Sequence, residues 1–208
     1  MKEKSAAPRT LSGRPRGFDA DTALRVAVDF FWQQGYEASS LEALSQARGL
    51  SRSSFYACFG SKHALLMAAV QLYADDRFAS LTECLATHTN SHEAVRAMLA
   101  VIADVDGGTR GCLFVNAVTE LAPGDAELVA LAQAHTARVG ALMVATLRRL
   151  GCTEVDAAER AGALLALVMG ITTLRKTGVP PSQLTGLLEQ ALHLIPNPSL
   201  LPPVRKYS

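Results

Sequence analysis

The sequence predicts an all-α fold, for two reasons. Apolar residues recur at helical spacing along almost the whole chain, and no stretch shows the alternation of apolar and polar residues that is typical of a strand. Gly and Pro residues, as at 107–108, 123–124 and 180–181, divide the chain into segments of ordinary helix length. With 208 residues, 49% of them apolar, the chain is able to bury a substantial core.

The first predicted helix begins near residue 19. Asp19 is a good N-cap, and Asp21 favours the positive end of the helix dipole. Apolar residues then recur at helical spacing from Ala23 to Phe31, and Gly35 is a typical C-terminal stop.

Two very short helices come next. Ser39 and Glu42 form an S-x-x-E capping box that opens the first of them. Gly49 makes the turn between them, and Ser51 caps the second. Two short helices joined by a Gly-containing turn are the layout of a helix-turn-helix.

The composition of this pair indicates a partner. A helix of about seven residues is not stable alone in water. Phe55 and Phe59 lie four residues apart and face the core, whereas the remaining positions are rich in Ser and Arg. Duplex DNA is the natural partner, so we predict a three-helix DNA-binding domain over residues 18–62.

A larger helical domain is predicted over residues 63–195. Gly60 ends the third helix, and Ser61 caps a long fourth helix that runs to about residue 87. Further helices are expected near 92–105, 112–121, 125–150, 154–176 and 181–194.

The two ends of the chain differ from this pattern. Residues 1–17 contain five Lys or Arg residues and one Glu, with Pro and Gly, which predicts a disordered basic arm. Residues 196–208 are rich in Pro and predict an irregular tail. The formal net charge is only +1, but residues 1–62 contain nine Lys and Arg residues and only six Asp and Glu residues.

The four cysteines lie far apart, form no C-x-x-C pair and follow no secretory signal. We therefore expect a reducing, cytoplasmic environment without a disulfide framework. No apolar run approaches the roughly 20 residues that span a bilayer, so no membrane partner is expected.

An enzyme is the main rival class, but the sequence contains no nucleophile elbow and no phosphate-binding Gly loop. His88 and His92 have metal-ligand spacing, but they fall between two predicted helices and lack a third ligand. We expect no catalysis, no cofactor and no metal. A protein-interaction module without DNA binding is the third class, and it leaves the Ser- and Arg-bearing short helices unexplained.

The stretch GRPRGFD, followed by QQGYEASSLEALSQARGLSRSSFYACFGSKHALL, resembles the N-terminal domain of TetR/AcrR-family transcriptional regulators over residues 14–75. Residues 110–125, RGCLFVNAVTELAPGD, are similar to a motif in one branch of that family, which includes repressors that respond to electrophiles through cysteine.

The resemblance implies a homodimer in which the helix-turn-helix domain sits on a larger regulatory and dimerisation domain with a ligand pocket. The last two long helices usually form the dimer interface. The implied partners are double-stranded operator DNA and an unknown small-molecule effector, and the implied activity is ligand- or stress-responsive regulation, usually repression.

The reading helix would span residues 52–59 and enter the major groove. The N-terminal arm would reach the minor groove, and the alternative is a disordered tail that only increases solubility. The resemblance implies that Tyr56 and Lys62 contact DNA phosphates. Ala57 and Cys58 depart from the family, which usually has a polar or aromatic residue at one or both of these positions. The predicted DNA-binding residues are Arg14, Arg16, Ser39, Ser40, Arg52, Ser53, Ser54, Tyr56, Ala57, Cys58 and Lys62.

Eight residues are candidates for a ligand pocket: Met98, Ile102, Cys112, Phe114, Asn116, Glu120, Met143 and Met169. Asn116 and Glu120 are the most suggestive, because buried polar groups need partners. The alternatives are an ordinary core for the apolar residues and a solvated edge for these two.

Two cysteines are candidate sensors of oxidants or electrophiles. Cys112 begins a predicted helix, a position that favours the thiolate, and it aligns with the reactive cysteine of the similar branch. Oxidation of Cys58 would place a charged or bulky group against DNA. The alternative is that both are inert small apolar residues.

Overall fold

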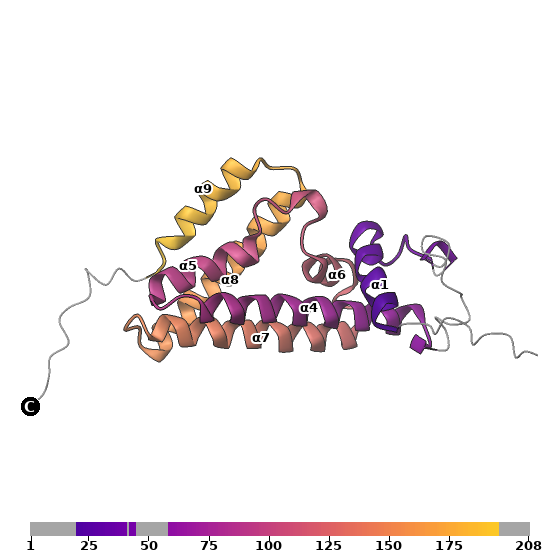
Figure 1. The fold of residues 1–208 in the computed structure, drawn as a ribbon, viewed down its shortest axis with the longest axis horizontal. Coiled ribbons are helices and arrows are strands. Elements are labelled where there is room, and N and C mark those ends of the chain that lie inside the picture. The colour runs from indigo at the N-terminus through magenta and orange to yellow at the C-terminus, as the bar shows by residue number, and fades with distance from the viewer. Residues whose placement is uncertain (1–19, 41, 45–57, 196–208) are drawn as a thin grey trace, which may run out of the picture.

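The computed structural model describes residues 20–40, 42–44 and 58–195, and this part of the chain contains helices and no strand (Figure 1). The helices are α1 (Ala20–Gln34), α4 (Lys62–Ala86), α5 (Ser91–Ala103), the 3-10 helix η1 (Gly108–Arg110), α6 (Leu113–Leu121), α7 (Ala126–Arg148), α8 (Glu154–Lys176) and α9 (Pro181–Leu192). The all-α prediction is confirmed.

Local capping signals set most helix starts. The Ser61 side chain accepts a hydrogen bond from the Ala64 amide at the start of α4, as predicted. Asn90, Asp125 and Thr153 cap α5, α7 and α8 in the same way. The predicted Ser39 cap is wrong, because Ser40, rather than Ser39, accepts from the Ala43 amide at 3.0 Å, and Ala43 cannot complete a capping box with Ser40.

Two hydrophobic clusters build the core, and α4 and α7 run alongside each other through both (Figure 1). One cluster joins α1, α6 and the N-terminal part of α4, with Leu128 of α7. The other joins α5, α8 and α9 to the rest of α7 and to Leu81 of α4. The first cluster therefore extends across the predicted domain boundary at residue 62.

By length and composition alone, α7 and α8 could also cross a membrane. Both instead contribute to the second cluster, with Val139, Met143 and Leu147 from α7 and Leu164 and Val168 from α8 among its buried residues. We interpret them as core helices, which pass the same test of length and hydropathy.

Large apolar side chains remain exposed on the two C-terminal helices. Leu167 and Leu174 of α8 and Leu187 of α9 are 45%, 40% and 43% exposed. These three leucines are the candidate interaction face of the two helices.

Candidate DNA-binding end and effector cavity

Most of the predicted DNA-binding residues cannot be placed, because Arg14, Arg16, Arg52, Ser53, Ser54, Tyr56 and Ala57 lie outside the described residues. Cys58 is exposed. Ser39 is buried, and its hydroxyl donates to the Tyr36 carbonyl at 2.7 Å. Ser40 is exposed at the start of the second helix.

Lys62 is the first residue of α4, and its Nζ lies 4.2 Å from the centre of the Tyr36 ring. This cation–π contact joins the turn after α1 to the start of α4. Next to it, the His63 Nε2 atom lies 2.6 Å from Asp125 Oδ2 at the start of α7. The Leu128 amide and, to a smaller extent, His63 hold the pKa of Asp125 below its ordinary value.

A cavity of about 80 Å³ lies among α4 to α8. Four of the predicted ligand residues line it: Ile102, Cys112, Phe114 and Met169. Met98 and Met143 are instead fully buried in the core packing. The wall is mostly apolar, and its polar side chains are Tyr73, Arg77, Cys112, His135, Thr136 and Thr172.

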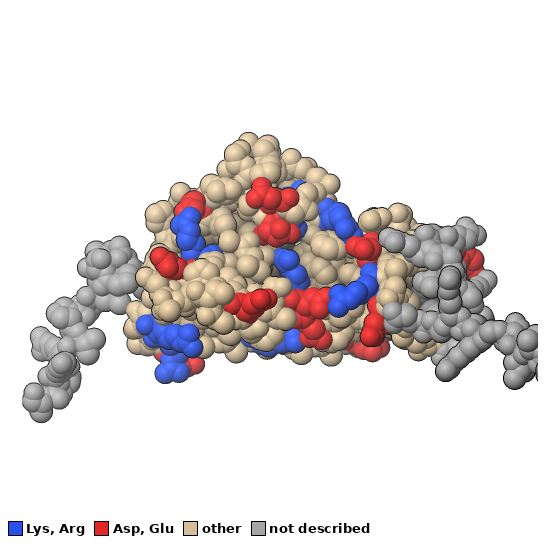
Figure 2. Space-filling view, viewed as in Figure 1, with Lys and Arg blue, Asp and Glu red and all other residues tan. Residues whose placement is uncertain are grey.

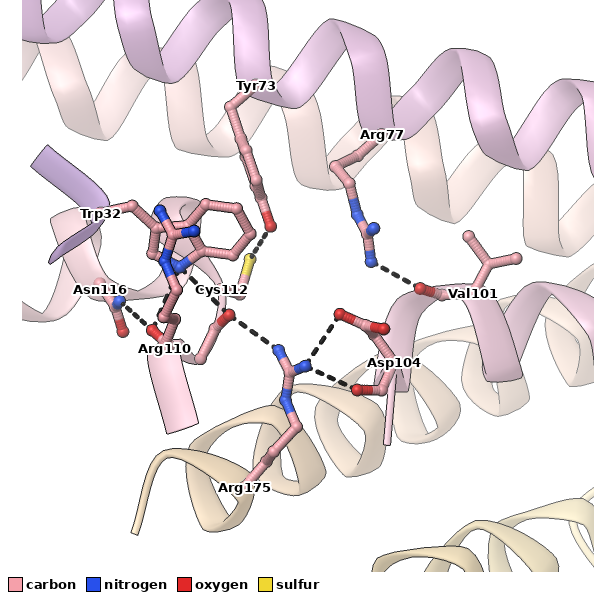
Figure 3. Close-up of polar contacts among 10 residues, drawn as sticks. Trp32, Tyr73, Arg77, Val101, Asp104, Arg110, Cys112, Asn116 and Arg175 are labelled. Atoms are coloured by element: carbon pink, nitrogen blue, oxygen red, sulfur yellow. Dashed lines mark hydrogen bonds and ion pairs between the residues drawn. The ribbon is translucent and has the colours of Figure 1, made fainter. Parts of the chain in front are cut away.

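Tyr73 and Arg77, which lie one turn apart on α4, form part of the cavity wall (Figure 3). The Tyr73 hydroxyl donates to Cys112 Sγ at 3.6 Å, and burial, with a smaller effect of Cys112, raises the pKa of Tyr73. The Arg77 Nη2 atom donates to the Val101 carbonyl at 2.6 Å, near the C-terminal end of α5.

His135 is neutral in the folded protein. Burial and the nearby Arg138 guanidinium lower its pKa to about 4, against a smaller opposing effect of Asp75. Arg138 Nε donates to His135 Nδ1 at 3.1 Å, and an arginine can only donate. The single imidazole proton is therefore on Nε2. The ring packs against Phe114, with 4.6 Å between ring centres.

The loop that carries Cys112 also contacts the DNA-binding end of the molecule (Figure 3). The Trp32 indole of α1 donates to the carbonyls of Arg110 and Gly111, at 3.1 and 3.3 Å. The Arg110 guanidinium lies 4.1 Å from the Trp32 ring centre and pairs with Asp29 at 3.1 Å. We call these contacts the interdomain junction.

Helix α6 completes the junction at its other end. Glu120 accepts hydrogen bonds from the backbone amides of Tyr36 and Glu37, the shortest at 2.8 Å. Gly35 has a φ of +76°, and a Cβ there would lie 3.1 Å from the Glu120 carboxylate. Only glycine meets both requirements easily, so the Glu120 carboxylate packs directly on the turn that follows α1.

Asn116 and Glu120 therefore have protein partners rather than positions in the cavity. Asn116 donates to the Arg110 carbonyl at 2.9 Å and accepts from the Lys176 ammonium at 3.0 Å. Both line a separate groove of about 530 Å³ between α1 and α6.

Arg175 of α8 fixes the loop from the opposite side (Figure 3). Its side chain is only 4% exposed and pairs with the Asp104 carboxylate at 2.8 Å. It also donates to the carbonyls of Asp104 and Gly111, at 2.6 and 2.8 Å. One loop thus connects α8, the cavity and α1.

Comparison with known proteins agrees with this architecture. Residues 23–69 match the family of bacterial regulatory proteins described as tetR. A cysteine mutant of the TetR-family regulator CifR, solved with a 26-base-pair operator DNA, is 31% identical with a TM-score of 0.75, covering 88% of this chain and 100% of that chain. The chain belongs to the TetR family.

Other TetR-family relatives extend the comparison. The transcriptional repressor ComR of Escherichia coli strain K12 is 29% identical over 88% of this chain and 92% of its own length. The reduced form of E. coli NemR, at 20% identity, shows the same fold with a TM-score of 0.76, over 86% of this chain and 98% of its own.

The regulatory part of this TetR-family chain has no surface of a single charge sign on the face shown in Figure 2, where acidic and basic side chains are interspersed over the described residues. No cluster of three or more His, Cys, Asp or Glu residues suited to a metal occurs within 20–40, 42–44 and 58–195.

Sequence reasoning missed Arg77, Arg110, Glu120 and Arg175 in these roles. The available signal for Arg175 was its position directly after the largely apolar run 161–174 of α8. Nothing local indicated which distant groups these side chains would meet.

Proposed function

We propose that this TetR-family chain is a cytoplasmic, ligand-responsive transcriptional repressor that binds a palindromic operator as a homodimer. The observation that carries the proposal is the likeness, over both domains, to a relative solved on operator DNA. Repression is supported by the names of two relatives, the transcriptional repressors ComR and BdcR.

Dimerisation is supported by the exposed leucines of α8 and α9. A two-fold axis through these helices would present two reading heads, and two heads read half-sites about 34 Å apart. DNA binding is then sensitive to any change in their separation.

Release by an effector is supported by the position of the loop. Cys112 lines the cavity, whereas Gly111 and Arg110, the two residues before it, contact Trp32 of α1. A ligand that fits best when the loop is displaced would favour a state with misplaced reading heads. This is a population shift, and it requires a ligand that prefers the released state.

A cysteine sensor is the second candidate. Cys112 Sγ stands at the cavity wall and accepts a hydrogen bond from Tyr73, so a compound in the cavity would reach the thiol. Mild oxidant should then release DNA reversibly. A Cys112→Ser protein that responds like the wild type would exclude Cys112 as the sensor.

A gel shift with the DNA upstream of its own gene tests the main proposal. We expect tight binding that weakens steeply with salt, and random DNA should compete poorly for the protein. Lys62→Ala should weaken binding to specific and random DNA alike, since we place Lys62 at phosphate. Failure to retard any upstream DNA would favour a protein-interaction module.

A further inference from the structure

The polar side chains of the cavity wall share one property: they offer hydrogen-bond donors and no carboxylate. Arg77 contributes guanidinium N–H groups, and His135 contributes its Nε2–H. Tyr73 contributes a protonated hydroxyl, whose pKa burial raises further above its ordinary value. The remaining wall is apolar, apart from Cys112 and two threonines.

Arg77 carries a positive charge without an acidic partner among the described residues. A guanidinium has five N–H donors, and the single hydrogen bond from Arg77 goes to the Val101 carbonyl. By contrast, Arg138 of α7, which lies over the Phe78 ring, pairs with Asp75 at 2.7 Å. Arg77 is half-buried at the cavity wall, and a charge-assisted hydrogen bond is stronger there than in open water, so an anion that pairs with Arg77 would gain affinity.

The cavity volume limits the size of such an anion. An apolar cavity of about 150 Å³ in another protein holds benzene. A cavity of about 80 Å³ therefore suits an even smaller molecule. The predominance of apolar wall residues, such as Ile102, Phe114 and Val139, calls for a short hydrocarbon part on that molecule.

We propose that the effector is a small monocarboxylate with two or three carbon atoms, whose carboxylate binds Arg77 and whose short apolar part fills the cavity. The inference rests on the proposed function, since it names the ligand class of the same regulatory cavity. His135 Nε2–H is the further donor available to the carboxylate oxygens, and the Tyr73 hydroxyl can join it by exchanging its hydrogen bond to Cys112 Sγ for one to the ligand.

The test is titration calorimetry on the pure protein, without DNA, at constant pH and ionic strength. Acetate and propionate are compared with acetamide and propionamide, which have the same shape but no charge. We expect at least one acid to bind and to exceed its amide by about tenfold or more.

Variants identify the site. Arg77→Met should weaken the acid by about tenfold and change the binding of the amide by less than about twofold. Arg77→Lys should keep the preference for the acid, because it keeps the charge. Arg148→Met, which removes an exposed arginine paired with Glu154 outside the cavity, should change neither. Circular dichroism verifies that each variant folds.

Several outcomes overturn the proposal: no acid binds, acid and amide bind equally, or Arg77→Met leaves the preference unchanged. Fluorescence anisotropy with upstream DNA then tests the ligand class separately from the proposed function. Binding that depends on Arg77 without DNA release preserves the ligand class and contradicts the proposed function. DNA release by thiol-reactive compounds alone, without binding of any acid, rejects the carboxylate and favours the cysteine sensor.

Discussion

Replacement of Arg175 by methionine should destabilise the protein more than any exposed substitution on α8. The substitution removes three hydrogen bonds from a buried guanidinium, two to Asp104 and one to Gly111. Each hydrogen bond to a charged group contributes about 1.5–3 kcal/mol. Methionine retains much of the apolar contact but leaves the loop without its attachment to α8.

Three effects reduce this sum. Removal of the guanidinium also removes the cost of its burial, which includes the unpartnered Nε atom. The Asp104 side chain is 38% exposed and is able to rehydrate. The Gly111 carbonyl keeps the Trp32 indole as a donor. We therefore expect a net loss of about 2–4 kcal/mol, in which breaking a buried ion pair is the main term.

Urea denaturation at a fixed protein concentration measures this loss, since dimerisation would make stability depend on concentration. The melting temperature should fall by about 4–16 °C for a chain of this size. Lys176→Met is the matched control: it removes one exposed contact, to Asn116, and should cost less than about 0.5 kcal/mol. A loss below about 1 kcal/mol for Arg175→Met, or one equal to the control, would refute the reasoning.

A double-mutant cycle sharpens the result. A Cβ on Gly107 would lie 1.7 Å from Arg175 Nη1 and 2.1 Å from Asp104 Oδ2, so Gly107→Ala alone must displace the buried pair. In the Arg175→Met background the same change has less to displace. The two losses should therefore add to clearly more than the loss of the double variant.

Three further predictions concern the junction, the cavity and the dimer face. Glu120→Ala removes the acceptor of the Tyr36 and Glu37 amides, so hydrogen exchange at these amides should quicken by about tenfold, whereas exchange in the middle of α8 should not change. The folded protein holds His135 neutral with a pKa of about 4 against an ordinary 6.5, so its contribution to stability is full above pH 6.5 and is lost as pH falls toward 4. His135→Gln should make unfolding less sensitive to pH in that window, and equal pH profiles would contradict the assignment. Leu167→Glu combined with Leu187→Glu should shift the particle from dimer to monomer in light scattering, because both leucines are exposed on the predicted interface.

Much of the fold follows from short-range signals. The start of α4 at Ser61 and the end of α1 before Gly35 were predicted from capping residues and from glycine, which act within a few residues of the helix end. The resemblance to TetR regulators likewise depended on one continuous stretch of the sequence, residues 14–75. The cavity was partly anticipated, since Ile102, Cys112, Phe114 and Met169 do line it.

The interdomain junction was decided by the tertiary structure alone. Glu120 meets amides 83 and 84 residues away, and Arg175 meets carbonyls 64 and 71 residues away. Helical periodicity identifies which residues share a face, but it says nothing about which face of another helix lies opposite. The hydrogen-bond partners of a polar side chain between domains depend on how the helices pack, and the packing is a property of the whole chain.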